Sequence, residues 1–257
     1  MKIIDTHTHI YESEFDSDIA DVIDRAKKIG VERILLPNID MNSIDRLHQL
    51  SASYPEYCMP MMGLHPTSVT SDWQQDLSFM KKLFTSNEYV AVGEIGLDLY
   101  WDKSLENEQR LAFEEQLRWS IEFDLPVSIH SREAISEAIE CIKNVGATHL
   151  RGVFHSFGGS EEELSNILEL GDFLIGINGI VTYKNSTLPA VLTQTDLSKI
   201  VIETDAPYLP PVPYRGKRNE TSYTMKIVEK LSDIYQTTPE DVATTTTQNA
   251  RNLFQLK

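Results

Sequence analysis

Two histidines stand one residue apart near the start of the chain, where a short apolar run ends. Residues 5–9 read DTHTH. Side chains two positions apart on a β-strand point to the same face, so His7 and His9 converge on one side with Asp5 behind them. Neutral imidazole is a common metal ligand, and two imidazoles held this close can share one divalent cation. The spacing predicts part of a metal site whose other ligands lie elsewhere in the chain.

Further histidines and carboxylates follow other short apolar, β-rich runs. In a parallel barrel the carboxyl ends of the strands meet at one rim, so side chains at these positions are expected to lie together. Two histidines stand apart from the pattern: His48 lies within a predicted helix and His149 just before a strand, and both are interpreted as structural or surface residues. The residues at strand ends are His7, His9, His65, Glu94, His130, His155 and Asp205.

Eight apolar runs alternate with helical patterns and would position these side chains. The runs span residues 2–5, 33–37, 59–63, 89–93, 126–129, 152–154, 173–177 and 200–203. Helical spacing marks residues 19–29, with Asp16 or Ser17 as the cap, residues 135–142 and 164–168, and a last helix after Pro239. Eight strand–helix repeats predict one (β/α)8 TIM-barrel domain over residues 1–257. An open doubly wound sheet has the same alternation and is the alternative.

Four of the imidazoles and the two carboxylates are too many ligands for one tetrahedral ion. The set suits two divalent ions about 3.5–4 Å apart, with a carboxylate bridging them. Glu94 comes from the middle of the strand order and is expected to bridge. The first and eighth strands are neighbours in a closed barrel, so one ion would take His7, His9 and Asp205 and the other His130 and His155. The predicted ligands are therefore His7, His9, Glu94, His130, His155 and Asp205.

The composition limits the classes of function that such a site can have. The formal net charge of −16 argues against a protein that coats nucleic acid, although a few local cations can still hold phosphates. No apolar run is long enough to span a bilayer, so no membrane contact is expected. Cys58 and Cys141 are isolated and suit a reducing compartment, so we expect a cytoplasmic protein, and a monomer.

An ordered set of motifs resembles one protein family. The motifs are DTHTH at 5–9, GLHP at 63–66, GEIGLD at 93–98, HSREA at 130–134, HSF at 155–157, ETDAP at 203–207, RGKRNE at 215–220 and NARNLF at 249–254. Together they resemble the TatD family of metal-dependent deoxyribonucleases, within the amidohydrolase-like metallo-barrels. Many metallo-barrels carry the first motif alone, whereas the ordered set is specific and runs from residue 5 to residue 254.

The resemblance implies a two-metal phosphodiesterase that hydrolyses DNA, expected to be an exonuclease on single-stranded or damaged DNA. It places the family's metal ligands on the six residues predicted above. A metal-activated water would be the nucleophile, with Glu94 and Asp205 as catalytic residues and Asp205 accepting the proton. The nitrogen-rich ligand set favours Zn²⁺, Mn²⁺ or Fe²⁺, whereas the family is usually described as Mg²⁺-dependent. The chain departs from the family in two loops, at residues 156–159 and at Thr221.

Other polar residues at the same rim are expected to support the centre. Glu203 would orient a ligand histidine or a water, and His65 would contact substrate or support a ligand. Tyr100 and Trp101 could stack on a base or serve as core or lid residues. Five cations on rim loops are expected to bind phosphate: Arg132, placed at the start of the helix after the fifth strand, and Lys184, Arg215, Lys217 and Arg218.

A second enzyme class shares much of this pattern. Metallo-barrel hydrolases of amides, lactones or esters, including relatives linked to D-aminoacyl-tRNA deacylation, carry the same paired histidines and those of the fifth and sixth strands. Many of them have a bridging lysine on the fourth strand, where this chain has Glu94. The glutamate favours the nuclease, and initial rates on DNA and on aminoacyl esters would separate the two classes.

Overall fold

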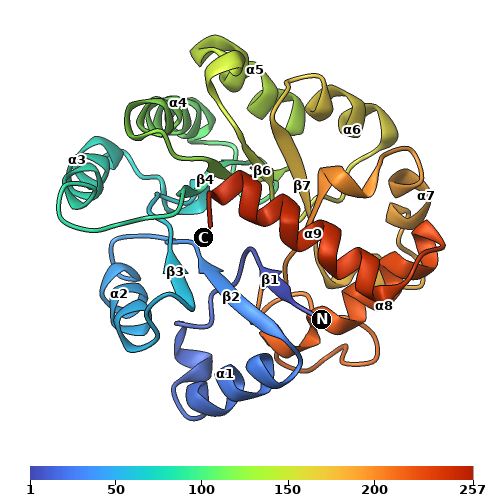
Figure 1. The fold of residues 1–257 in the computed structure, drawn as a ribbon. Helices are drawn as coiled ribbons and strands as arrows, with labels where there is room; N and C mark the ends of the chain where they lie inside the picture. Colours follow the sequence, from blue (N-terminus) through green and yellow to red (C-terminus); the bar gives the residue numbers. More distant parts are fainter. Residues whose placement is uncertain (257) are drawn as a thin grey trace.

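Eight parallel strands form a closed ring in the computed structural model, which describes residues 1–256 (Figure 1). Met62 pairs with Val92 and joins the run β1-β2-β3 to the run β4-β5-β6-β7-β8. On the other side, the Thr6 amide donates to the Ile202 carbonyl at 3.0 Å and joins β1 to β8. The predicted (β/α)8 barrel is therefore confirmed, and the open doubly wound sheet is wrong. The strands are β1 (Ile3–Asp5), β2 (Val31–Leu36), β3 (Cys58–Pro60), β4 (Val92–Asp98), β5 (Val127–Arg132), β6 (Gly152–Phe154), β7 (Phe173–Ile177) and β8 (Ile200–Ile202).

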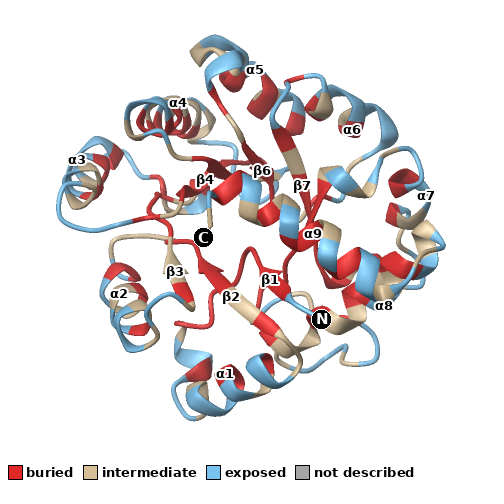
Figure 2. Ribbon diagram, viewed as in Figure 1, coloured by how far each residue is buried: buried red, intermediate tan, exposed pale blue. Residues whose placement is uncertain are grey.

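Helices surround the ring and bury one apolar face each against the strands (Figures 1 and 2). In α1, Val22, Ile23 and Ala26 are buried at the spacing that predicted the helix. Its N-cap is Asp18, not one of the two residues predicted, because residues 13–15 form a separate 3-10 turn before it. None of the helices within residues 1–256 is both long and apolar enough to cross a membrane. The helices are α1 (Ile19–Lys28), α2 (Ile44–Ser53), α3 (Trp73–Leu83), α4 (Glu106–Phe123), α5 (Ile135–Val145), α6 (Glu161–Leu168), α7 (Leu188–Leu192), α8 (Thr224–Tyr235) and α9 (Pro239–Phe254).

Two strands extend past their predicted ends at the rim that carries the polar residues, whereas β3 ends at Pro60, three residues before its predicted end. β4 begins at Val92 and continues to Asp98, so Glu94 lies inside the strand and not after it. β5 extends to Arg132, which ends the strand instead of opening the helix. The two strands pair with each other as far as Asp98 and Arg132. An apolar run marks only the buried part of a strand, and here the backbone ladder continues through polar residues.

The helix α9 lies across one end of the ring (Figure 1). Its apolar residues Ala250, Leu253 and Phe254 are buried against side chains that point into the barrel from the strands. Thr238 caps the helix by accepting a hydrogen bond from the Asp241 amide at 3.1 Å. This end of the barrel interior is an apolar core, which we call the α9 plug: Ile4, Leu35, Met61, Ala91, Val153, Val201, Ala250, Leu253 and Phe254.

The side chains that point into the barrel change from apolar to polar along the strands. Val153 belongs to the α9 plug, and two residues further along, at the same face, stands His155. Val201 is likewise followed in its row by Glu203. The same two-residue period that builds the plug at one end therefore delivers polar side chains to the other end.

Candidate metal centre

The six predicted ligand residues meet at the carboxyl end of the barrel, opposite α9. They come from five places: after β1, within β4, within β5, after β6 and after β8. A cavity of about 820 Å³ opens over them. Most of their surface is buried, and Glu94 at the centre is only 2% exposed. The structure thus brings together side chains that are up to 198 positions apart in the sequence (His7 and Asp205).

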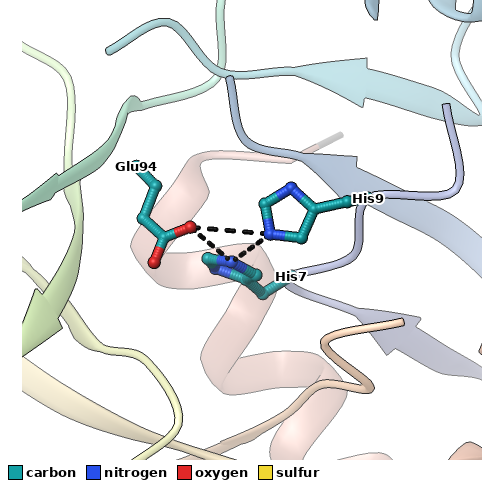
Figure 3. A group of neighbouring side chains, drawn as sticks. All are labelled: His7, His9 and Glu94. Atoms are coloured by element: carbon teal, nitrogen blue, oxygen red, sulfur yellow. Dashed lines mark hydrogen bonds and ion pairs between the residues drawn. The ribbon is translucent and has the colours of Figure 1, made fainter. Parts of the chain in front are cut away.

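One group of ligand atoms surrounds the Oε2 atom of Glu94. His7 Nε2 lies 3.1 Å from this oxygen and His9 Nε2 lies 3.5 Å from it, while the two nitrogens are 3.2 Å apart (Figure 3). Asp205 Oδ1 lies 3.6 Å from His9 Nε2 and 3.9 Å from His7 Nε2. An ion with four tetrahedral ligands at about 2.1 Å separates them by about 3.4 Å. The spacing and the donor types of this group fit a divalent metal ion.

A second group faces the other oxygen of the same carboxylate. His130 Nδ1 lies 3.0 Å from Glu94 Oε1, and His155 Nε2 lies 3.1 Å from it. His65 Nε2 is 3.4 Å from the same oxygen, so a residue predicted to support the centre is as close as a ligand. Its other ring nitrogen is 2.7 Å from the Thr67 hydroxyl. Glu94 therefore stands between two sets of imidazoles, with one oxygen toward each.

Tyr11 fixes the orientation and tautomer of His9. The tyrosine hydroxyl donates to the Pro37 carbonyl at 2.6 Å and lies 3.0 Å from His9 Nδ1. Because its single hydrogen is committed to the carbonyl, the hydroxyl must accept from the Nδ1 hydrogen. The lone pair of Nε2 is then directed at Glu94 and Asp205. No sequence signal other than its place two residues after His9 pointed to Tyr11.

Glu203 faces His155 from the interior of the barrel. Glu203 Oε1 lies 3.3 Å from His155 Nδ1 and accepts the Ser156 amide at 2.5 Å. The predicted role of orienting a histidine stays a prediction, and this carboxylate is close enough to His155 to fill it. Oε2 is buried without a hydrogen-bond partner among residues 1–256, and it lies against Gly176, where an added Cβ would be 2.1 Å away. His7 joins His155 and Glu203 in a third close group of potential ligands.

Sequence reasoning missed two further partners of the ligand histidines. Asp98 Oδ2 lies 2.9 Å from His130 Nε2, and the Ser128 hydroxyl lies 3.2 Å from His7 Nδ1. Ser128 precedes His130 by two residues on an inward-facing row, so the strand period could have identified it. Asp98 stands in the GEIGLD motif, but only the pairing of β4 with β5 shows what it contacts. Such partners set the ring orientation of metal-binding histidines.

The carboxylates and imidazoles of the centre shift each other's pKa values in a way that favours positive charge beside Glu94. Burial opposes ionisation of the Glu94 carboxyl, yet the imidazoles of His155, His65 and His7 hold its pKa well below the usual range. Burial would lower the pKa of His155, but Glu94 and Glu203 raise it well above its usual value. The pKa of His7 is lowered by its burial and by the neighbouring His155. A divalent ion would supply this charge while the imidazoles stay neutral as ligands.

The five cations predicted to bind phosphate do not all reach the cavity. Arg132 lines it, and within residues 1–256 its guanidinium has no ion-pair partner. Arg215 lies over the Tyr183 ring, 4.0 Å from its centroid, outside the cavity lining. Lys184 and Lys217 are also outside that lining. Arg218 is paired with both carboxylate oxygens of Asp18 at 2.8 Å, which commits it to the contact with α1.

The two histidines set apart in the sequence lie away from the centre. His48 on α2 has its Nε2 atom 2.9 Å from the Tyr89 hydroxyl, which ties the helix to the segment before β4. His149 is exposed in a short 3-10 turn before β6. Neither residue is in a group of potential metal ligands among residues 1–256.

Known proteins resemble this chain along almost its whole length. The profile of the family described as "TatD related DNase" matches residues 4–255. A Bacillus subtilis protein named "Uncharacterized metal-dependent hydrolase YabD" is 35% identical over 255 residues, which cover 99% of each chain. A Yersinia pseudotuberculosis protein named "3'-5' ssDNA/RNA exonuclease TatD" is 33% identical over 261 residues, covering 99% of this chain and 100% of the relative. The crystal structure of YjjV, a TatD homologue from Escherichia coli, superposes with a TM-score of 0.92 at 28% identity, covering 99% of this chain and 98% of that one.

Proposed function

Since the chain belongs to the family of TatD-related DNases, we propose that it is a 3′–5′ exonuclease that hydrolyses single-stranded DNA with two divalent ions. Two relatives support this proposal, one named a metal-dependent hydrolase and the other an exonuclease on single-stranded DNA and RNA. The chain would act as a cytoplasmic monomer of one domain. All six proposed ligands come from one chain, and its two cysteines are free and buried, as a reducing compartment allows.

One observation carries the two-ion proposal. The two oxygens of Glu94 face different sets of imidazole nitrogens, at 3.1 and 3.5 Å on one side and at 3.0 and 3.1 Å on the other. A carboxylate placed in this way can bind one ion through each oxygen. His7, His9 and Asp205 would hold the first ion, and His130 and His155 the second. His65 is close enough to act as an additional ligand or to contact the substrate.

The chain's own residues have distinct tasks in this proposal. The bound ions supply a nucleophile at neutral pH and neutralise charge on the phosphate. Burial opposes ionisation of Asp205, but His9, His155 and His7 lower the pKa of its carboxyl. Asp205 is therefore ionised at neutral pH and can accept a proton from the attacking water. Arg132, at the cavity wall, would bind the phosphate of the substrate.

The depth of the centre favours an end of a single strand as substrate. The ligand atoms lie at the bottom of a cup, and His7, Glu94 and Asp205 have side chains that are at most 12% exposed. A phosphate within a duplex is held in a stiff, wide rod, whereas the end of a single strand can enter such a cup. This geometry supports the proposal that the enzyme cleaves from the end, nucleotide by nucleotide.

The test begins with protein stripped of metal by a chelator. Mg²⁺, Mn²⁺ or Zn²⁺ is then added back separately, and cleavage of 5′-labelled single-stranded DNA is followed together with metal content. We expect a ladder of products shortened one nucleotide at a time, and two equivalents of metal per chain. Absence of cleavage with every ion would contradict the nuclease assignment. Rapid hydrolysis of an aminoacyl ester in the same samples would favour the ester hydrolase instead, and RNA of the same sequence tests the choice of sugar.

A further inference from the structure

Two aromatic side chains stand exposed at the mouth of the cavity, in the loop after β4. Trp101 is 69% exposed and lines the cavity, and Tyr100 is 48% exposed. Their rings contact edge to face, with centroids 4.8 Å apart. The other two tryptophans, Trp73 and Trp119, are at most 9% exposed. A large aromatic surface left in water beside a cavity lined with charged ligand residues is typical of a binding site.

Arg132 packs on the same two rings. Its guanidinium lies 3.9 Å from the Tyr100 centroid and 5.1 Å from the Trp101 centroid. Stacking uses the face of the guanidinium and leaves its N–H edges available for a phosphate. Arg218 shows the contrasting case, since its edges are occupied by Asp18. We call Tyr100, Trp101 and Arg132 the aromatic platform.

Asp98 fixes the aromatic platform relative to the proposed metal ligands. Its Oδ1 atom accepts the backbone amides of Tyr100 at 3.1 Å and Trp101 at 3.3 Å. Its Oδ2 atom lies 2.9 Å from His130 Nε2. One carboxylate therefore joins the platform to a ligand histidine, and the neighbouring strand adds a hydrogen bond from the Leu99 amide to the Arg132 carbonyl at 3.0 Å.

We propose that the aromatic platform stacks on the base of the terminal nucleotide while its phosphodiester lies at the metal centre. This inference rests on the proposed exonuclease function and adds a base-binding subsite to it. Stacking accepts every base, because each has an aromatic face, so the subsite recognises the presence of a base and not its identity. The guanidinium of Arg132 would contact the phosphate while its face packs on Tyr100. An abasic end would lose the stacking and keep the phosphate contact.

The test compares first-nucleotide release from two oligonucleotides that differ only in whether their terminal sugars carry bases. Abasic sugars are placed at both ends, so the result does not depend on the direction of digestion. The wild-type kcat/KM is expected to be about 5- to 150-fold higher for the base-bearing end, the range for one base–aromatic stack. Trp101→Ala should remove most of this preference by slowing only the base-bearing substrate, and Trp101→Phe should restore part of it.

Binding without turnover provides a second measurement. Metal-loaded protein is titrated with a deoxynucleoside 5′-monophosphate or with deoxyribose 5-phosphate, and tryptophan emission is recorded. The nucleotide is expected to bind more tightly and to quench the emission of Trp101. Phe79→Ala is the matched control, since Phe79 is an exposed aromatic residue on α3, outside the cavity lining, and its loss should change neither measurement.

Three results would overturn the platform while leaving the nuclease intact. They are equal wild-type rates on base-bearing and abasic ends, an equal loss of both rates in Trp101→Ala, or equal affinities for the two small ligands. Wild-type protein that cleaves neither oligonucleotide with any of the three ions would overturn the proposed function itself, and the platform with it. Circular dichroism and thermal unfolding of Trp101→Ala should show that the exposed substitution leaves the barrel folded.

Discussion

The two ends of the barrel interior are built from the same strands but from different side chains. At one end the α9 plug closes the ring with apolar residues, and at the other the inward rows finish in imidazoles and carboxylates. A shift of two residues along β6 leads from Val153 to His155, and along β8 from Val201 to Glu203. The apolar end stabilises the ring by burial, and the polar end places the ligand atoms. The comparison predicts that stability and chemistry can be changed separately in this molecule.

Glu94→Ala should break the polar end alone and has the largest expected effect. The substitution removes both oxygens that the two sets of imidazoles face. Exonuclease turnover should fall to the level of the metal-stripped protein, and bound metal should fall below two equivalents. Circular dichroism should still report the barrel, because the α9 plug is untouched. Wild-type turnover in this variant would refute the bridging role of Glu94.

Phe254→Ala is the matched change at the apolar end. It removes a buried ring from α9, and a substitution of this kind costs about 3–5 kcal/mol of unfolding free energy. Urea unfolding measures the loss, while metal content and kcat at low temperature should stay at wild-type values. A variant that unfolds normally but loses metal would show that the two ends are coupled.

Tyr11→Phe tests one supporting hydrogen bond within the polar end. The variant keeps the ring and removes the hydroxyl that accepts from His9 Nδ1. Loss of such a supporting hydrogen bond typically costs 10- to 100-fold, so metal affinity should fall by about that factor in a chelator competition. Tyr235→Phe is the control, because its hydroxyl also donates to a carbonyl, that of Leu192, far from the centre. Equal affinities in both variants would mean that His9 needs no support from Tyr11.

Thr238→Ala should have the smallest effect and probes the start of α9. Its hydroxyl oxygen accepts from the Asp241 amide, and loss of an N-cap costs about 1 kcal/mol. Thermal unfolding should show a small decrease in melting temperature with unchanged kcat. A glycine in place of the threonine should cost less than alanine does, since glycine is itself an acceptable cap.

The barrel and the position of its polar side chains at one rim could both be predicted from the sequence, each for a physical reason. The eight apolar runs mark strands, and the residues after them must reach one rim once the strands are parallel. The helix spacing at residues 19–29 predicted which face of α1 is buried. The metal roles of His7, His9, Glu94, His130, His155 and Asp205 stay predictions that the add-back experiment tests.

Other features depend on contacts between distant segments and could not be predicted. Arg218 has the same type and loop position as a phosphate-binding residue, but Asp18, two hundred positions earlier, neutralises it. Asp98 receives its role from His130 on the next strand. The bounds of β4 were wrong because the backbone ladder does not depend on apolar side chains. In each case the outcome depends on how distant segments pack together, which a local sequence pattern does not show.

The ring closes where the first strand meets the last, so it cannot close before the last strand has been synthesised. The proposed first ion needs His7 and Asp205, so its site can form only when the segments after β1 and β8 meet. Phe254 of the α9 plug is translated later still. A nascent chain stalled before residue 239 would carry every proposed ligand while the apolar interior stays open to water, and pulse proteolysis of such ribosome-bound chains should find them unprotected. We therefore expect the proposed metal site to form only after α9 has been synthesised and has packed on the ring.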